Sequence, residues 1–214
     1  MKFCVIGVGR FGYQVATTLA EHGMEVLAVD SSETTIASIR DKVTQAICMS
    51  VSDEEALRSI GIEEIGTVIV AMGENFAQSI LVTALLKQKL KVPLVIARSI
   101  SQIHKEILQL IGADQVVLPE QEMGRRLADN LSLPFNSLLR VTSHFSISQI
   151  KIPQRFVGKT TKELRLFGNY HVYAIGYKKD DEVLPLEPSY RFNADDVLLC
   201  AGLNDDLAKI AKLL

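Results

Sequence analysis

The hydrophobic positions of roughly the first 130 residues follow a repeating pattern, in which short, nearly continuous apolar runs alternate with helical segments. The apolar runs predict strands over 2–6, 24–29, 45–49, 67–71, 94–97 and 115–118. The segments between them predict helices over 11–22, 34–40, 54–60, 75–89, 102–111 and 120–131. Apolar strands of this kind are typical of a parallel sheet that is buried on both faces. The pattern therefore predicts an α/β fold with a doubly wound sheet of six parallel strands, which would bind a ligand at the carboxyl ends of the strands.

The pattern changes after residue 131. Residues 132–146 lose the alternation of strand and helix, and they contain Pro134, which interrupts regular structure. The remaining sequence predicts an apolar run over 147–152, a short helix over 161–166, strands over 171–178, 182–186 and 197–201, and a closing helix over 205–213. These elements would form a small α+β unit. We therefore predict two domains, residues 1–134 and residues 135–214.

The composition narrows the class of protein. Of 214 residues, 48% are hydrophobic and 22% are charged, which is typical of a globular chain. The net charge is −2 without a strongly basic segment, so no nucleic-acid partner is expected. Neither a signal peptide nor an apolar stretch long enough to cross a bilayer is visible, so we expect a cytoplasmic protein. Cys4, Cys48 and Cys200 lie far apart in apolar runs, which predicts buried thiols and neither a zinc site nor a disulfide.

The strongest local signal is a glycine pattern directly after the first predicted strand. Gly7, Gly9 and Gly12 form G-x-G-x-x-G at the start of a predicted helix. In a Rossmann-like fold these glycines allow a tight turn, a close approach to phosphate and close packing of helix on strand, while the helix N-terminus attracts the anion. Asp30 ends the second predicted strand, where a carboxylate can accept both ribose hydroxyls and would repel a 2′-phosphate. The pattern predicts nucleotide binding. The alternative is a glycine turn that only packs the helix, with Asp30 capping the helix that begins near Thr34.

Two arginines bear on the choice of nucleotide. Arg10 lies inside the glycine loop, where its guanidinium would sit beside the phosphates. Because the pyrophosphate of NAD carries less charge than a triphosphate, a cation here favours ATP or ADP. The alternative for Arg10 is a solvated residue at the start of a helix. Arg98 ends the fifth predicted strand and is a second candidate phosphate contact, with pairing to a structural acid as an equal alternative.

No catalytic constellation is visible. A dehydrogenase needs an acid or base poised for hydride chemistry, and His144 and His171 of the C-terminal unit belong to no recognisable set. The Gly-Lys-Thr sequence at 158–160 is not a phosphate-binding Walker A motif, because Pro153 stands where the first glycine is required. We interpret it as a turn before a helix. We therefore expect no enzyme activity. An NAD(H)-binding redox-sensing regulator and a small NAD-dependent oxidoreductase remain the alternatives.

Several segments recur together in one known family. They are V-I-G-V-G-R-F-G at 5–12, Asp30, A-M-G-E-N-F-A-Q-S-I-L-V-T-A-L-L-K at 71–87 and I-G-A-D-Q-V-V-L-P-E-Q-E-M-G at 111–124, followed by a small C-terminal domain. In this order they resemble the cytosolic regulatory subunit of bacterial Ktr/Trk potassium uptake systems. That family pairs a nucleotide-binding RCK domain (regulator of potassium conductance) with a smaller C-terminal RCK subdomain. The resemblance covers essentially the whole chain, and it is closer to the Ktr branch because only one G-x-G-x-x-G unit is present.

The resemblance implies roles for individual residues. Those that would surround the nucleotide are Gly7, Val8, Gly9, Arg10, Phe11, Gly12, Asp30, Ser31, Ser50, Val51, Ser52, Ala71, Met72, Gly73, Asn75 and Arg98. The glycine loop would hold the phosphates, and its Arg10 would reach the terminal phosphate of a nucleotide in the neighbouring subunit. Asp30 and Ser31 would hold the ribose, and residues 50–52 would edge the adenine in place of the G-D-A-T-like segment of relatives. Glu120 would help to hold a divalent cation or sodium between ATP phosphates, or else is simply an acid favoured in the first turn of a helix.

The resemblance also implies an assembly. The family forms an octameric ring built from dimers, which lies at the inner face of the cell membrane beneath an integral membrane subunit that translocates potassium. ATP would activate this partner and ADP would inactivate it through a change of ring shape.

In relatives the C-terminal subdomain binds cyclic di-AMP at its dimer interface. The corresponding positions here are Arg165, His171, Val172 and Pro188, although Tyr170 and His171 depart from the family pattern. Dimer packing alone is the alternative role for this patch.

Overall fold

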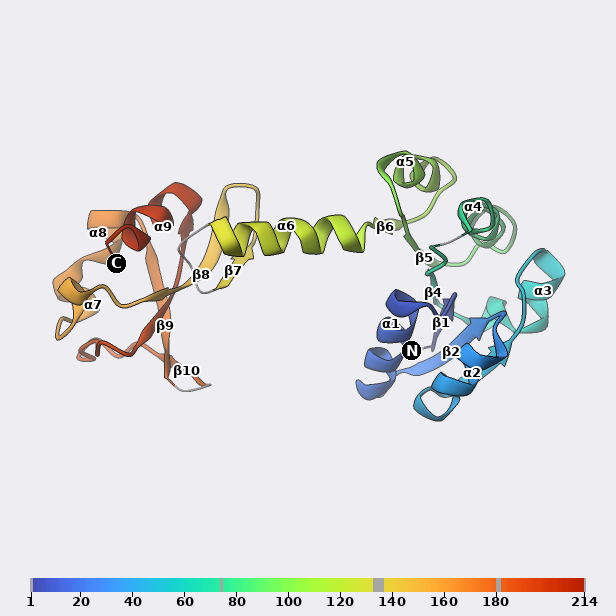
Figure 1. Cartoon of the computed structure of the whole chain (residues 1–214), viewed down its shortest axis with the longest axis horizontal. Coiled ribbons are helices and arrows are strands. Elements are labelled where there is room, and N and C mark those ends of the chain that lie inside the picture. Colours follow the sequence, from blue (N-terminus) through green and yellow to red (C-terminus); the bar gives the residue numbers. More distant parts are fainter. Residues whose placement is uncertain (1, 74, 133–136, 180–181, 214) are drawn as a thin grey trace. The chain divides into compact units, whose positions relative to one another are not determined.

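The structure, a computed structural model, describes residues 2–73, 75–132, 137–179 and 182–213 (Figure 1). The chain divides into two compact units, Met1–Glu122 and Met123–Leu214. This division falls within α6 (Pro119–Ser132), whereas the predicted domain boundary after residue 134 lies outside the described residues. In the described part of the chain, no helix is both long enough and apolar enough to cross a bilayer.

Within its described residues, the first unit forms a six-stranded parallel sheet in the order β3-β2-β1-β4-β5-β6. The strands are β1 (Lys2–Ile6), β2 (Glu25–Asp30), β3 (Gln45–Cys48), β4 (Thr67–Val70), β5 (Leu94–Arg98) and β6 (Gln115–Val117). The predicted α/β, doubly wound fold is therefore confirmed. The strand order reverses between β1 and β4, and ligands of such sheets bind beside this point at the carboxyl edge.

The connecting helices follow the predicted alternation. They are α1 (Arg10–Glu21), α2 (Glu33–Ile39), α3 (Glu54–Ser59), α4 (Phe76–Ala84) and α5 (Gln102–Leu110), with short 3-10 turns η1 (Arg40–Lys42) and η2 (Ile62–Glu64). A π-helical turn, η3 (Leu85–Lys89), continues α4 directly, so the single helix predicted over 75–89 changes its winding in its last turn.

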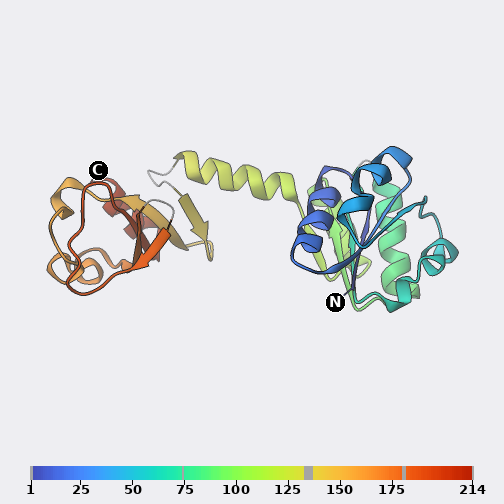
Figure 2. The same ribbon diagram turned by 90° about the horizontal axis from the view of Figure 1, so that it is seen from below.

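Alternate side chains of each central strand enter different core clusters, which is why these strands are apolar along their whole length. Cys4 and Ile6 of β1 pack in one cluster with Leu108 of α5. Val5 packs in the other cluster with Ala16 of α1. Helices accordingly cover both faces of the sheet (Figure 2).

The second unit, over its described residues, holds a five-stranded antiparallel sheet in the order β10-β9-β11-β8-β7. Its elements are β7 (Ser137–Arg140), β8 (Phe145–Lys151), η4 (Gln154–Phe156), α7 (Thr161–Leu164), α8 (Leu166–Tyr170), β9 (Tyr173–Lys179), β10 (Glu182–Pro185), β11 (Val197–Leu203) and α9 (Asn204–Ala211). Phe156, Phe192 and Leu198 are buried in its core with Leu207 and Ile210 of α9. The predicted α+β subdomain is confirmed.

Two predictions for this unit were wrong in detail. The sequence indicated no strand before residue 147, but β7 pairs with β8 as an edge strand and owes its form to that pairing. The helix predicted over 161–166 breaks at Arg165, whose backbone is left-handed (φ 46°), and α8 begins after it. The turn predicted at 158–160 is confirmed, since Thr160 caps α7 in a capping box with Glu163.

The prediction of three buried cysteines was also wrong at one position. Cys4 and Cys200 are buried, but Cys48 is exposed at the end of β3. β3 is a four-residue edge strand with a neighbour on one side, so its last side chain stays exposed although the surrounding sequence is apolar.

Candidate nucleotide-binding site

A cavity of about 780 Å³ lies at the carboxyl edge of the parallel sheet. Fourteen of the residues predicted for the site line it: Gly7, Gly9, Arg10, Phe11, Asp30, Ser31, Ser50, Val51, Ala71, Met72, Gly73, Asn75, Arg98 and Glu120. These residues follow or end β1, β2, β3, β4, β5 and β6, so the topology brings together positions that are far apart in the sequence. The cavity lies where a doubly wound sheet binds its ligand.

The glycine loop has the geometry that each of its glycines was predicted to provide. Gly7 has a left-handed backbone (φ 90°), and a Cβ there would lie 3.0 Å from the backbone nitrogen of Met72. A Cβ on Gly12 would lie 2.0 Å from the carbonyl oxygen of Gly7, so only glycine lets α1 approach the loop. A Cβ on Gly9 would meet nothing within 4 Å. The space in front of Gly9 is therefore open to a ligand.

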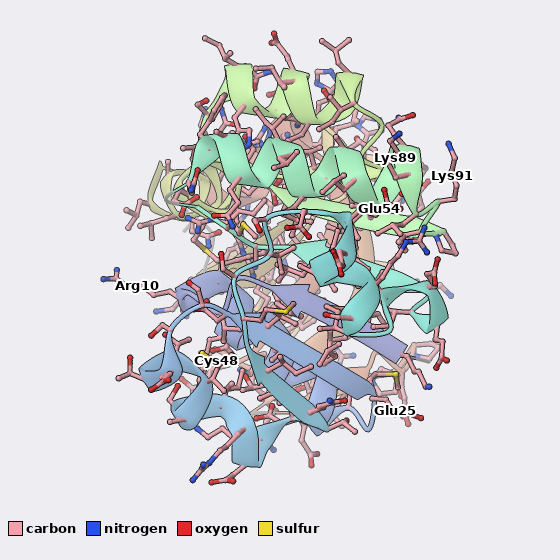
Figure 3. All side chains as sticks on the ribbon, turned by 90° about the vertical axis from the view of Figure 1, so that its right-hand side faces the viewer. Arg10, Glu25, Cys48, Glu54, Lys89 and Lys91 are labelled. Carbon is pink, nitrogen blue, oxygen red and sulfur yellow. The ribbon has the colours of Figure 1, made fainter. Side chains whose placement is uncertain are left out.

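The start of α1 offers donors and a positive charge to that space. Gly9 is the N-cap residue, and neither it nor any acid of the first turn satisfies the free N–H groups there. Arg10, the first residue of the helix, is exposed and extends outward from the ribbon (Figure 3). An anion at this position would gain from the helix dipole, the N–H groups and the guanidinium together.

Asp30 binds the loop as well as lining the cavity. Its Oδ2 accepts a hydrogen bond from the backbone N–H of Val8 at 2.7 Å, and its Oδ1 accepts one from the N–H of Ser32 at 2.9 Å. A carboxylate has about four lone-pair directions, so both oxygens can still accept ribose hydroxyls. The cap of α2 is Ser32, whose hydroxyl accepts from the N–H of Thr35, and not Asp30.

The segment after β3 is tied to α4. Gln78 donates from its side chain to the carbonyl of Val51 at 2.8 Å, and Asn75 caps α4 by accepting from the N–H of Gln78. The side-chain oxygen of Asn75 is thus engaged within the protein, which leaves its backbone as the part free to face a ligand. Ser50 is exposed, whereas Val51 is buried at 2% exposure.

The far end of the cavity holds a charged pair. Arg98 donates through Nη2 to Oε1 of Glu120, and its Cζ lies 5.9 Å from the centre of the Phe11 ring. The N–H of Glu120 itself and the Arg98 guanidinium hold the pKa of the Glu120 carboxyl below its ordinary value. Of the two alternatives for Arg98, the structure shows the pairing with an acid.

Three predicted residues do not line the cavity. Val8 is buried and donates its N–H to Asp30, Gly12 is a buried residue of α1, and the hydroxyl of Ser52 donates to Asp53. Six further residues line the cavity without having been predicted from the sequence: Ile6, Val29, Ser32, Thr35, Met49 and Gln78. Ser32 could have been found from its position before an acid-led helix, which is a capping pattern. The others carry no distinct chemical signal.

Comparison with known proteins identifies the family. Residues 3–119 match the TrkA-N domain and residues 147–214 match the TrkA-C domain. The chain belongs to the KtrA-like RCK family. The predicted resemblance is confirmed.

Two curated relatives match this RCK chain over nearly its whole length. The Ktr system potassium uptake protein C of Bacillus subtilis is 32% identical, over 99% of this chain and 96% of the relative. The Ktr system potassium uptake protein A of Vibrio alginolyticus is 31% identical, over 100% and 97%. Among solved structures, the GsuK channel bound to NAD matches 99% of this chain with a TM-score of 0.68 at 16% identity. This chain spans 39% of that channel chain, and the likeness establishes the shared fold.

The TrkA-C domain places the residues predicted for cyclic di-AMP on and beneath its surface. Arg165, His171 and Pro188 are exposed, and the first two have left-handed backbones (φ 46° and 55°). Val172 is fully buried in the core, so its side chain is not available to a ligand. The ring of Phe167, which is 53% exposed, lies beside His171 with ring centres 6.1 Å apart.

The described residues of the RCK chain contain no group of three or more histidine, cysteine, aspartate or glutamate side chains arranged to hold a metal ion. Glu120 contributes a single carboxylate that already pairs with Arg98. Glu120 as a cation ligand stays a prediction.

Proposed function

We propose that this chain is the cytoplasmic, nucleotide-sensing regulatory subunit of a potassium uptake system and that it has no catalytic activity. The observation that carries the proposal is the cavity that joins the glycine loop, Asp30 and Arg10 in one site. Relatives that match the chain over its full length are named for potassium uptake. The cavity supplies what a nucleotide needs for binding. Among the described residues that line it, the two carboxylates, Asp30 and Glu120, are held in hydrogen bonds within the protein and form no acid–base or nucleophile set of the kind that catalysis requires.

The proposed ligand is ADP or ATP. Its phosphates would lie over Gly9 against the N-terminus of α1, where no Cβ and no capping side chain intervenes. The ribose hydroxyls would bond to Asp30, and the adenine would lie toward Ser50 and Val51. This arrangement places the terminal phosphate on the side of Arg10 and Arg98.

Arg10 would distinguish ATP from ADP. Its exposed guanidinium can reach a terminal phosphate in its own site or in that of a neighbouring subunit, and only ATP carries the additional charge. A ligand shifts a ring between two shapes only by its differential affinity for them, and a coupling of about 1–3 kcal/mol per site is typical of allosteric proteins. Repeated around a ring, such a coupling would open the transport pathway with ATP and close it with ADP.

We propose that the chain acts as an octameric ring of dimers at the inner face of the membrane, beneath an integral membrane subunit. Exposed apolar side chains support association: Ile103 and Leu110 of α5 are 69% and 85% exposed, and Leu81 of α4 is 45% exposed. In α6, Met123, Leu127 and Leu131 are each more than half exposed at a spacing of four residues. Apolar stripes of this kind mark protein contacts. The mass of the purified protein in solution, by light scattering, tests the proposed octamer.

We further propose cyclic di-AMP as a second ligand, bound at the surface around Arg165, His171 and Pro188. The exposed Arg165 would supply a cation for phosphate, and the exposed ring of Phe167 beside His171 would supply a surface for the base. Calorimetric titration of cyclic di-AMP into the full chain tests this ligand. Saturable heat that is lost in Arg165→Ala supports it, and the absence of saturable heat in the wild type refutes it.

Calorimetric titration with ATP, ADP, NAD and NADH tests the nucleotide site. We expect saturable binding of ATP and ADP that weakens by about tenfold or more in Asp30→Ala, because hydrogen bonds to a charged group are lost. Asp41→Ala, which removes an exposed carboxylate outside the cavity, is the matched control. A clear preference for NADH would refute ATP/ADP sensing and favour the redox-sensing alternative.

Reconstitution with the membrane subunit tests the coupling. Potassium flux through the complex should be greater with ATP than with ADP, and Arg10→Ala should remove that difference. Arg40→Ala, an exposed arginine outside the cavity, should retain it. If ATP and ADP still act differently on Arg10→Ala complexes, Arg10 is not the phosphate sensor.

A further inference from the structure

Positively charged side chains gather at one end of the second unit, although the whole chain has a net charge of −2. They are Arg155, Lys159, Lys162, Arg165 and Arg191, and all of them are exposed. The first four lie in the stretch from residue 154 to residue 170, in which Glu163 is the one acid. We call these five basic residues the basic cap.

The fold brings Arg191 to the other four residues of the basic cap. The N–H of Gly158 donates to the carbonyl of Phe192 at 2.8 Å, and Arg191 donates through Nη1 to the carbonyl of Gly158 at 2.8 Å. Arg155 donates through Nη2 to the hydroxyl of Tyr170 at 2.8 Å, which ties η4 to α8. Figure 1 shows α7 and α8 at the same end of this unit. The basic cap is therefore one region of the surface, built around η4, α7 and α8.

The charge of the basic cap is mostly uncompensated. Glu163 takes part in the capping box of α7 and pairs with Arg191 at 3.2 Å, so its charge is already engaged. The other members, among them Lys159, Lys162 and Arg165, form no ion pair with any residue that the structure describes. Five cations and one carboxylate leave a net charge of +4 on this region. Such a region attracts anions.

The lysines of the basic cap suit a layer of mobile anions better than one fixed anion. A lysine ammonium is a compact charge on a flexible stem, and it lacks the fixed fork with which arginine holds a single phosphate or carboxylate. Neither Lys159 nor Lys162 is held in place by a side-chain hydrogen bond within the described part of the chain. The anionic lipids of a leaflet can move laterally to meet each such charge, and the cytoplasmic leaflet attracts clusters of lysine and arginine in this way. A folded acidic protein would need charges at matching, fixed positions.

We infer that the basic cap docks directly on the anionic headgroups of the lipid membrane. The inference rests on the proposed function, because that function places the chain at the inner face of the membrane. It adds a contact between the second unit and lipid to the proposed contact with the integral membrane subunit. The docking is electrostatic, so it requires no inserted segment and is reversed by salt.

Sedimentation with lipid vesicles tests the docking on the full chain. We expect the wild type to bind vesicles of phosphatidylcholine that contain about one-third phosphatidylglycerol, and not vesicles of phosphatidylcholine alone, because only the former are anionic. Binding should be lost when the salt concentration rises from about 0.1 M to about 1 M, since the Debye length falls from about 10 Å to about 3 Å. The double variant Lys159→Gln/Lys162→Gln should bind about 25-fold more weakly, at about fivefold for each lysine. Arg165 stays unchanged because it is shared with the proposed cyclic di-AMP site.

The matched control removes the same charge from another part of the chain. Lys89→Gln/Lys91→Gln replaces two exposed lysines of the first unit and should bind vesicles like the wild type (Figure 3). Equal weakening by the two double variants would overturn the inference, because the net charge alone would then explain the binding. It is also overturned if the wild type does not bind the phosphatidylglycerol vesicles or binds both kinds of vesicle equally. A poly-glutamate peptide that binds the wild type when the vesicles do not would assign the basic cap to an acidic protein partner instead.

Calorimetric titration with ADP separates this inference from the proposed function. Lys159 and Lys162 do not line the cavity, so their double variant should bind ADP like the wild type, and thermal unfolding should show that it is folded. A wild type that binds ADP but no vesicles overturns the docking alone. A wild type that binds the anionic vesicles but no nucleotide refutes the proposed nucleotide site and supports the docking.

Discussion

Replacing Gly12 by alanine tests whether the glycine loop is built as the structure shows. The new methyl group would lie 2.0 Å from the carbonyl oxygen of Gly7, whereas ordinary contacts begin near 3.4 Å. The obstacle is backbone and not a flexible side chain, so relief requires α1 to move away from the loop by more than about 1 Å.

Two effects of opposite sign decide how far Gly12→Ala changes the free energy of unfolding. Alanine is the better helix former and would stabilise α1 by about 1 kcal/mol relative to glycine. Overpacking a well-packed contact costs about 1–3 kcal/mol, and here the atoms cannot repack around a carbonyl. Because the contact cannot repack, the upper end of that cost applies, and we expect Gly12→Ala to lower the free energy of unfolding by about 2 kcal/mol. ADP binding should weaken by about tenfold or more, because the loop and the helix N-terminus would no longer present their N–H groups to one phosphate.

Urea unfolding and calorimetric ADP titration measure the two quantities on the same preparations. Gly9→Ala is the informative partner, since its methyl group would meet no protein atom within 4 Å. It should lose no more stability than the roughly 0.5–1 kcal/mol that alanine costs at an N-cap, and still lose ADP affinity, because the methyl group points into the space proposed for phosphate. Gly66→Ala, also free of contacts and outside the cavity, should change neither property. A Gly12→Ala protein with wild-type stability and wild-type ADP affinity would refute the reasoning.

Two further predictions follow from buried groups. Burial lowers the pKa of His104 below its ordinary value of 6.5, so the unfolded chain takes up the proton first and the free energy of unfolding falls as the pH drops through about 6.5. The unfolding midpoint should therefore decrease between about pH 7.5 and about pH 5.5, and it should decrease less in His104→Phe than in the exposed control His22→Gln. Equal decreases in the two variants would contradict this role of His104. Of the three cysteines, only the exposed Cys48 should react quickly with a disulfide reagent in the native protein. The other two thiols are buried, which raises the pKa of Cys200 to about 12 and also raises the pKa of Cys4. Fast reaction of a second thiol would contradict the structure.

The fold of the first unit was predictable because its signals are local and redundant. Cys4, Val5 and Ile6 enter two different clusters, so β1 must be apolar throughout, and a continuous apolar run is visible in the sequence. The edge strand β7 is different, since its four residues are extended only because β8 provides a partner. Arg165 is left-handed without being glycine, and its sequence neighbours gave no sign of that break.

The chemistry of the cavity was predictable in part. Gly7, Gly9 and Asp30 could be assigned because a motif fixes their spacing relative to the strands. The partner of Arg98 could not be chosen from the sequence, because Glu120 lies on another element and only the fold brings the two together. The capping role of Asn75 was likewise hidden, since only the structure shows that its side chain accepts a hydrogen bond from the N–H of Gln78 at the start of α4.

For Asp30, the sequence and the structure each contribute a separate part of the prediction. Its position at the end of β2 predicts a ribose ligand, and the structure adds that the same carboxylate holds the N–H of Val8 at 2.7 Å. The carboxylate therefore holds the loop in place without a nucleotide, which would reduce the ordering cost of binding at the proposed site. Loss of affinity in Asp30→Ala accordingly contains two contributions, the missing ribose bonds and a loosened loop. A fall in the unfolding midpoint without nucleotide would report the second contribution alone, because no ribose is present to be lost.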